Sequence, residues 1–288
     1  MSRFSLWLLV PALGWLGMFF AIPLLMMLLV SFASRGVYGG VEWTWTLANY
    51  GALLDPIYLR IYARSFVLAF ATTCLCVALG FPLAWSMATS ASSRQRVWLL
   101  LIMIPFWTNF LVRSYAWMFI LRADGLLNTA LRGIGLVTAP IEVLYSDTAV
   151  LIGLVYGYLP FMVLPLYAAL ERIDRALLEA GRDLYASGWS VFRLIVLPLA
   201  KPGLIAGCIL VFVPSLGAFI TPDLLGGARS MMVGTLIQHE YLVVRDWPFG
   251  SAASLVLMAA VAAAAWWYLR HEAGSWRGRS VLRAGGAQ

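Results

Sequence analysis

Few residues in the sequence have the chemistry to bind a charged solute. Asp223 follows Pro222 at the end of an apolar run, and Phe219 stands four positions earlier. A carboxylate attracts an ammonium group by charge, and a ring face adds a cation–π contact. Glu240 and Trp107 are weaker candidates of the same kind. The alternative for Asp223 is a solvated residue in a helix-ending turn.

Arg113 is the one charge well inside an apolar run. A central arginine costs about 2.5 to 3.5 kcal/mol on membrane-insertion scales, so we expect its side chain to face the protein interior or to reach outward to the interface. It is then a residue of a solute pathway, half of an ion pair across a subunit interface, or a structural anchor near the outer boundary. For an oxyanion solute, Arg113 would be a recognition group.

The sequence lacks the residues that a metal site or an ATP-hydrolysing P-loop would need. The three cysteines lie in apolar runs without C-x-x-C spacing, and the two histidines have no His or Cys neighbours at ligand spacing. A P-loop needs Gly-x-x-x-x-Gly-Lys, but the single lysine, Lys201, follows Ala200. We expect no metal and no cofactor, no covalent catalysis, and no ATP hydrolysis by that route.

The elements that position these residues are membrane spans. Hydrophobic residues make up 62% of the 288 and charged residues 11%, where a soluble domain carries roughly 25%. A helix crosses the hydrocarbon core with about 20 mostly apolar residues. We therefore expect one all-α membrane domain over residues 1–288, with six spans at about 6–32, 61–89, 97–121, 148–170, 203–222 and 248–269.

The basic residues indicate the orientation of these spans. Lys and Arg accumulate in cytoplasmic loops. With both termini inside, six basic residues fall in outer segments, Arg64 and Arg113 fall within spans, and twelve fall on the inner side: Arg3, Arg94, Arg96, Arg172, Arg175, Arg182, Arg193, Lys201, Arg270, Arg277, Arg279 and Arg283. The net charge of +7 thus fits an inner-membrane protein with cytoplasmic N- and C-termini, and no nucleic-acid partner is required.

The inner loop 171–201 has its own pattern. Its first half places Ile173, Leu177 and Leu178 on one face of a short amphipathic helix, with charged residues on the other faces. Ser187-Gly188 should break this helix, and a second apolar segment should run from Trp189 to Pro198. Amphipathicity alone favours an interfacial helix that links two spans.

The residue order within this loop resembles the EAA loop of ABC importer permeases. That pattern has Glu-Ala-Ala, a Gly a few residues later, and Ile-x-Leu-Pro at the end; this chain reads EAGRDLYASGWSVFRLIVLPL. Gly181 replaces the third Ala, and Tyr185 stands where the Gly is usual. In the family, the loop docks into a cleft on the ATPase subunit. The resemblance places this docking at Glu179, Ala180, Gly181, Asp183, Tyr185 and Gly188.

Later segments are similar to the permeases of spermidine and putrescine importers. These segments are PFWTNFLVRSYAW (105–117), LPFMVLPLYAALERID (159–174), ITPDLLGGARSMMVG (220–234) and RDWPFGSA (245–252). The resemblance implies a type I ABC importer permease fold in the lipid bilayer. It also implies an ATPase dimer that binds ATP, a second homologous permease, and a periplasmic or extracellular binding protein that delivers a polyamine.

Two other classes of function compete with this interpretation. An ion-coupled secondary carrier needs buried carboxylates within its spans, and none of the thirteen acidic residues lies near a span centre. A membrane scaffold gives no reason for the EAA-like order. Within the importer class, an oxyanion or another small solute is the alternative substrate.

Overall fold

A computed structural model describes residues 3–284 of the chain; for 3–10, 12–13, 267–269 and 271–284 it describes the backbone only. The chain forms two compact units. One contains the chain up to Leu59 and from Leu236 onward, and the other is Arg60–Thr235. Both chain ends, which we expect inside, lie outside the described residues.

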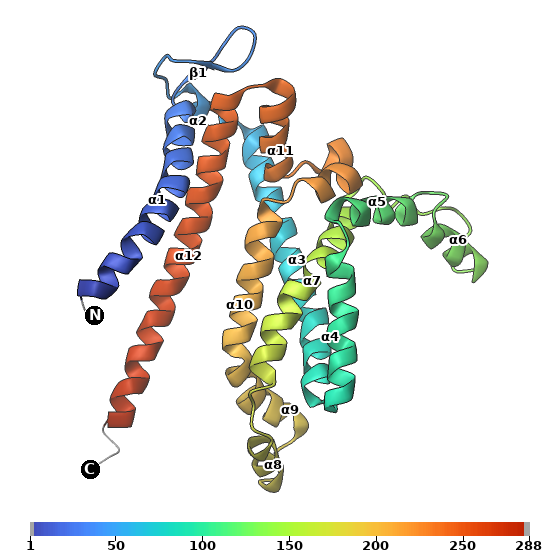
Figure 1. Ribbon diagram of the computed structural model, residues 1–288. Coiled ribbons are helices and arrows are strands. Elements are labelled where there is room, and N and C mark those ends of the chain that lie inside the picture. The colour runs from blue at the N-terminus through green and yellow to red at the C-terminus, as the bar shows by residue number, and fades with distance from the viewer. Residues whose placement is uncertain (1–2, 285–288) are drawn as a thin grey trace. The chain divides into compact units, whose positions relative to one another are not determined.

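The first unit is built on two long helices that pack side by side, α1 (Arg3–Ser31) and α12 (Trp247–Ala284) (Figure 1). Large apolar side chains on α1 are exposed, as lipid-facing helices require. Between α1 and the short α2 (Ala48–Ala52), β1 (Ser34–Arg35) pairs antiparallel with β2 (Val41–Glu42). The first turns of α3 and the end of α11 complete this unit.

The second unit contains most of the helices. Figure 1 shows α8 and α9 at one end of the α7 and α10 pair, and α5 at the other. The elements are most of α3 (Pro56–Thr89), α4 (Ser92–Trp107), α5 (Phe110–Leu121), α6 (Leu126–Gly133), α7 (Asp147–Leu170), α8 (Arg175–Asp183), α9 (Gly188–Val191), α10 (Leu197–Leu216) and the start of α11 (Val233–His239), with π-helical segments at Phe192–Val196 and Pro222–Gly226 and a 3-10 turn at Gly227–Ser230. A further π-helical segment, Glu240–Val244, lies in the first unit.

Small residues allow α7 and α10 to pack closely. A Cβ on Gly203 would lie 2.5 Å from the Pro165 carbonyl oxygen, and one on Gly207 would lie 2.7 Å from the Met162 sulfur. Gly203 and Gly207 are four residues apart and so share one face of α10. Close approach at small residues is the usual way in which membrane helices associate without a hydrophobic driving force.

Two buried clusters form the core of this unit. Met87, Met162 and Leu166 belong to a cluster from α3, α7 and α10. Leu154 and Leu225 belong to a second cluster, which joins α7 to residues 218–232. The first lies on the side of α8 and the second on the side of α5.

Five described helices are long and apolar enough to cross a membrane, and the number rises to six if a bent pair is counted as one span. Helices α1, α3, α7 and α12 occupy the runs expected at 6–32, 61–89, 148–170 and 248–269. The expectation of one continuous helix at 97–121 is wrong, because α4 and Phe110–Gly133 meet at 92°. The expected span 203–222 is wrong at both ends, since the helix starts at Gly188 and stops at Leu216.

Candidate functional site

The bend between α4 and α5 creates the wall of a cavity. Pro105 lies within the last turn of α4, and Asn109 caps α5 by accepting a 2.8 Å hydrogen bond from the Leu111 backbone N–H. The Thr108 hydroxyl donates to the Pro105 carbonyl oxygen over 2.6 Å. A proline that loosens one helix and an Asn that starts the next together explain the break.

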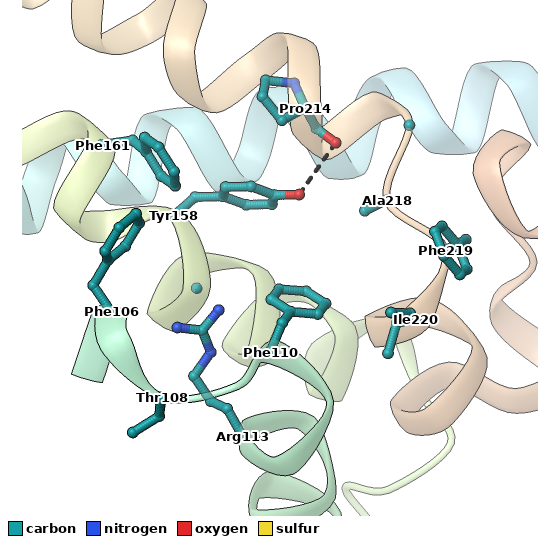
Figure 2. Close-up of a pocket in the computed structure, with 12 residues that line it drawn as sticks. Phe106, Thr108, Phe110, Arg113, Tyr158, Phe161, Pro214, Ala218, Phe219 and Ile220 are labelled. Atoms are coloured by element: carbon teal, nitrogen blue, oxygen red, sulfur yellow. Dashed lines mark hydrogen bonds between the residues drawn. The ribbon is translucent and has the colours of Figure 1, made fainter. Parts of the chain in front are cut away.

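The cavity has a volume of about 510 Å³. Figure 2 shows aromatic rings from α4, α5 and α7 around it, and the Tyr158 hydroxyl donating to the Pro214 carbonyl oxygen over 3.2 Å. The lining residues come from four helices and the segment after α10: Phe106, Thr108, Phe110, Arg113, Gly157, Tyr158, Phe161, Pro214, Gly217, Ala218, Phe219 and Ile220. An apolar cavity with a few polar groups is the usual form of a small-solute site.

Arg113 points from α5 into the space between Phe106 and Phe110 (Figure 2). Its guanidinium carbon lies 4.9 Å from the Phe110 ring centroid and 5.8 Å from that of Tyr156, and its Nη1 donates to the Pro105 carbonyl oxygen over 3.2 Å. Of the twelve lining residues, all in the described part of the chain, Arg113 alone is charged. The cavity is thus an aromatic site that already holds a cation.

A second break brings Phe219 to the same cavity. Helix α10 ends at Leu216, and helical structure resumes only at Ile220, so the break precedes Pro222 instead of lying at it. Pro222 opens a π-helical segment, where its missing N–H costs nothing. Asp223 lies in that segment; it is exposed and does not line the cavity.

Of the five residues that the sequence predicts for a solute pathway, the structure brings two, Arg113 and Phe219, to the cavity. Trp107 is 79% exposed and lies outside the cavity lining. Glu240 belongs to the first unit, where burial raises the pKa of its carboxyl and Asp246 raises it further.

The lining residues Phe106, Tyr158 and Phe161 were not anticipated from the sequence. Each lies in a run where aromatic side chains ordinarily face lipid or a helix interface. Pro105 beside Phe106 was the available signal, because an interrupted apolar segment marks binding sites in transporters.

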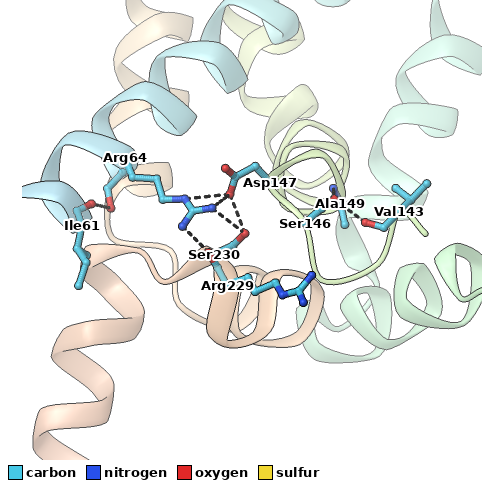
Figure 3. Close-up of polar contacts among 9 residues, drawn as sticks. Ile61, Arg64, Val143, Ser146, Asp147, Ala149, Arg229 and Ser230 are labelled. Atoms are coloured by element: carbon cyan, nitrogen blue, oxygen red, sulfur yellow. Dashed lines mark hydrogen bonds and ion pairs between the residues drawn. The ribbon is translucent and has the colours of Figure 1, made fainter. Parts of the chain in front are cut away.

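A polar cluster connects α3, the start of α7 and the 227–230 turn (Figure 3). Arg64 of α3 pairs with Asp147, the first residue of α7, at 2.7 Å; it also bonds the Arg229 carbonyl oxygen, while the Ser230 hydroxyl donates to Asp147 over 2.7 Å. A carboxylate in the first turn of α7 also suits the helix dipole. The cluster fixes the 227–230 turn against α3 and α7.

The segment expected to dock an ATPase is a helix, a turn and a second helix. Asp174 caps α8 by accepting from the Ala176 backbone N–H over 3.0 Å, and Ser187 caps α9 by accepting from the Ser190 N–H over 3.2 Å. The short helix is present, but Ile173 precedes it and it ends at Asp183. The break therefore lies at 184–187, and Ser187-Gly188 begins the second helix instead of ending the first. The expected end of the second segment at Pro198 is wrong, since helix continues through Pro198 into α10.

The two departures from the EAA pattern have structural consequences. Gly181 is buried, and a Cβ there would lie 3.0 Å from Ile195 Cδ1 and 3.3 Å from Val191 Cγ2, so glycine lets α8 lie close to the second helix. Tyr185 is 98% exposed and left-handed, at φ 55°. That conformation favours glycine, which explains the usual Gly at this place.

The remaining residues of the docking segment are at the surface. Glu179, Ala180, Asp183 and Gly188 are all exposed. Leu184 and Trp189 are also exposed, at 82% and 69%, although they are apolar. This surface is available to a partner. Among the described residues, no group of three His, Cys, Asp or Glu side chains is placed to hold a metal ion.

Comparison with protein families and relatives gives consistent matches. The model of the family described as binding-protein-dependent transport system inner membrane component matches residues 80–274. The spermidine/putrescine transport system permease protein PotB of Escherichia coli (strain K12) is 43% identical over 250 residues, which cover 87% of this chain and 91% of PotB. PotB of Haemophilus influenzae is 43% identical over 257 residues, which cover 89% and 90%.

A solved structure shows the same fold. It is a bacterial ABC transporter involved in the import of the acidic polysaccharide alginate, with a TM-score of 0.71 at 18% identity over 93% of this chain and 95% of that one. The chain therefore has the type I fold of ABC importer permeases.

Proposed function

The chain belongs to the family of binding-protein-dependent transport system inner membrane components, and on this premise we propose that it forms half of the pathway of an ATP-driven polyamine importer. Its substrates are cations like putrescine and spermidine. The whole chain acts as one transmembrane domain in the inner membrane, with both termini cytoplasmic. It performs no covalent chemistry and holds no cofactor itself.

The observation that carries the substrate assignment is the aromatic cavity. Its Phe110 ring already holds a guanidinium at 4.9 Å, with Tyr156 at 5.8 Å. Ring faces attract ammonium and guanidinium groups by the same quadrupole interaction, with about 0.5 to 2 kcal/mol per contact. A site of this strength suits a permease, because the solute must leave as readily as it enters.

The partners follow from what this chain lacks. It has no P-loop, so ATP is bound and hydrolysed by a separate ATPase, present as a dimer that meets the 175–191 segment. Glu179, Asp183 and the exposed Tyr185 ring form the contact surface. A second homologous permease supplies the other half of the pathway, and a binding protein delivers solute outside.

Uptake in cells that express the complete complex tests the substrate assignment. We expect saturable accumulation of radiolabelled putrescine and spermidine, abolished when the P-loop lysine of the partner ATPase is replaced. Sulfate and molybdate, supplied in parallel, should not accumulate. Oxyanion uptake without polyamine uptake would refute the assignment.

One observation favours an oxyanion as the second candidate. Arg113 is charged and no carboxylate lines the cavity among the described residues. An anion would bind the guanidinium directly, as arginines bind sulfate or phosphate elsewhere. The PotB relatives, at 43% identity, support the polyamine instead.

A further inference from the structure

The cavity presents an electrostatic problem for a cationic solute. Arg113 places a positive charge among the lining rings, and no Asp or Glu lies within 4.0 Å of it in the described part of the chain. An ammonium that entered would meet a like charge, and the Phe110 face would already be occupied. Two cations repel each other and cannot both lie on one ring face.

The attachment of Arg113 is weak enough to be broken. Its one described hydrogen bond runs to the Pro105 carbonyl oxygen at 3.2 Å, and that oxygen also accepts from the Thr108 hydroxyl at 2.6 Å. When Arg113 leaves, Pro105 keeps a partner, so no buried carbonyl is left unsatisfied. The side chain is only partly buried, and water can reach the displaced guanidinium.

We propose that Arg113 is a tethered competitor, which occupies the ammonium position of the cavity in the empty permease and must be displaced before an alkylammonium solute binds there. The inference rests on the proposed polyamine transport. Arg113 then has a function in a pathway for cations. It keeps stray cations out of the empty cavity, and a solute with several charges displaces a guanidinium that a single small cation cannot displace.

Equilibrium binding of radiolabelled putrescine to the purified complete transporter, without binding protein or ATP, tests this directly. Arg113→Gln removes the charge and keeps a polar amide on a shorter side chain. We expect it to bind putrescine about tenfold more tightly than the wild type, because one ring contact and one repulsion are released. Arg229→Met, at an exposed side chain outside the cavity lining, is the control and should change nothing.

Arg113→Lys provides the second variant if Arg113→Gln fails to assemble. A lysine keeps the charge but lacks the flat guanidinium that lies on the rings, so it should compete less well and bind putrescine about threefold more tightly than the wild type. Unchanged or weaker putrescine binding in the assembled variants would overturn the proposal. So would sulfate binding by the wild type that Arg113→Gln abolishes, since Arg113 would then be an anion site.

The two proposals fail in different ways. If the wild-type complex transports no polyamine, the proposed function falls and the competitor role with it. If the wild type transports polyamine and the Arg113 variants bind putrescine no more tightly, only the competitor role falls.

Discussion

Gly203→Ala tests the closest helix contact in the second unit. A Cβ at this position would lie 2.5 Å from both the Pro165 carbonyl oxygen and the Ala169 Cβ, where ordinary contact begins at 3.4 Å. Since one neighbour is backbone, no side-chain rotation can relieve the clash. Helices α7 and α10 must therefore move apart by about 0.9 Å at this level, which is the kind of overpacking that costs about 1 to 3 kcal/mol.

The better helix propensity of alanine offsets part of this loss, by about 1 kcal/mol at most. We expect a net destabilisation of about 1 to 2 kcal/mol, seen as a fall of about 3 to 6 °C in the melting temperature of the detergent-solubilised protein. Gly17→Ala is the matched control: it makes the same change in α1, where nothing lies within 4 Å of the added methyl group. It should leave the melting temperature unchanged or slightly higher.

Size-exclusion chromatography after heating, followed by tryptophan fluorescence, measures both variants in one format. A Gly203→Ala protein as stable as Gly17→Ala would refute the described packing of α7 on α10. It would mean that the two helices are separated by more than the glycine requires.

Three further changes concern the docking segment. Tyr185→Gly removes a side chain from a left-handed backbone, so it should raise stability by about 1 kcal/mol. It should also weaken ATPase binding if the exposed ring contacts the partner. A lower melting temperature would contradict the backbone strain inferred at Tyr185. Glu179→Arg reverses an exposed charge, so the protein should insert normally but lose ATPase association and uptake; wild-type uptake would exclude the docking role. Ser187→Cys, in a background without native cysteines, should resist an impermeant thiol reagent in intact cells. Efficient labelling would mean that the docking segment lies outside and that the expected orientation is reversed.

Composition was sufficient to place four of the six expected spans. Apolar runs of about 20 residues leave a chain little choice in lipid, and α3 and α7 lie where their runs predict. The bend at Thr108 was not foreseen, since a hydropathy count over 97–121 is the same for a straight helix and for two helices at 92°. Pro105 and the Asn109 cap were visible, but proline also occurs in unbroken spans, as Pro160 does in α7.

The cavity was harder to predict than the spans for a similar reason. Phe106 and Phe161 lie edge to face at 5.2 Å although they are far apart in sequence, and the sequence does not indicate that their helices meet there. Arg113 was identified because a charge within an apolar run stands out. Asp223 was a candidate because it follows Pro222 at the end of an apolar run near Phe219, but it does not line the cavity.

The unbroken helical run from Gly188 to Leu216 has a mechanical consequence. Its 29 residues measure about 43 Å at 1.5 Å per residue, so a tilt of one degree about one end moves the other by about 0.8 Å. One end carries Trp189, beside the surface proposed to meet the ATPase, and the other carries Pro214 and leads into Phe219 of the cavity wall. If the ATPase displaces the Trp189 end as proposed, rigid tilting of this run moves the cavity wall directly, without any relay of side chains between them.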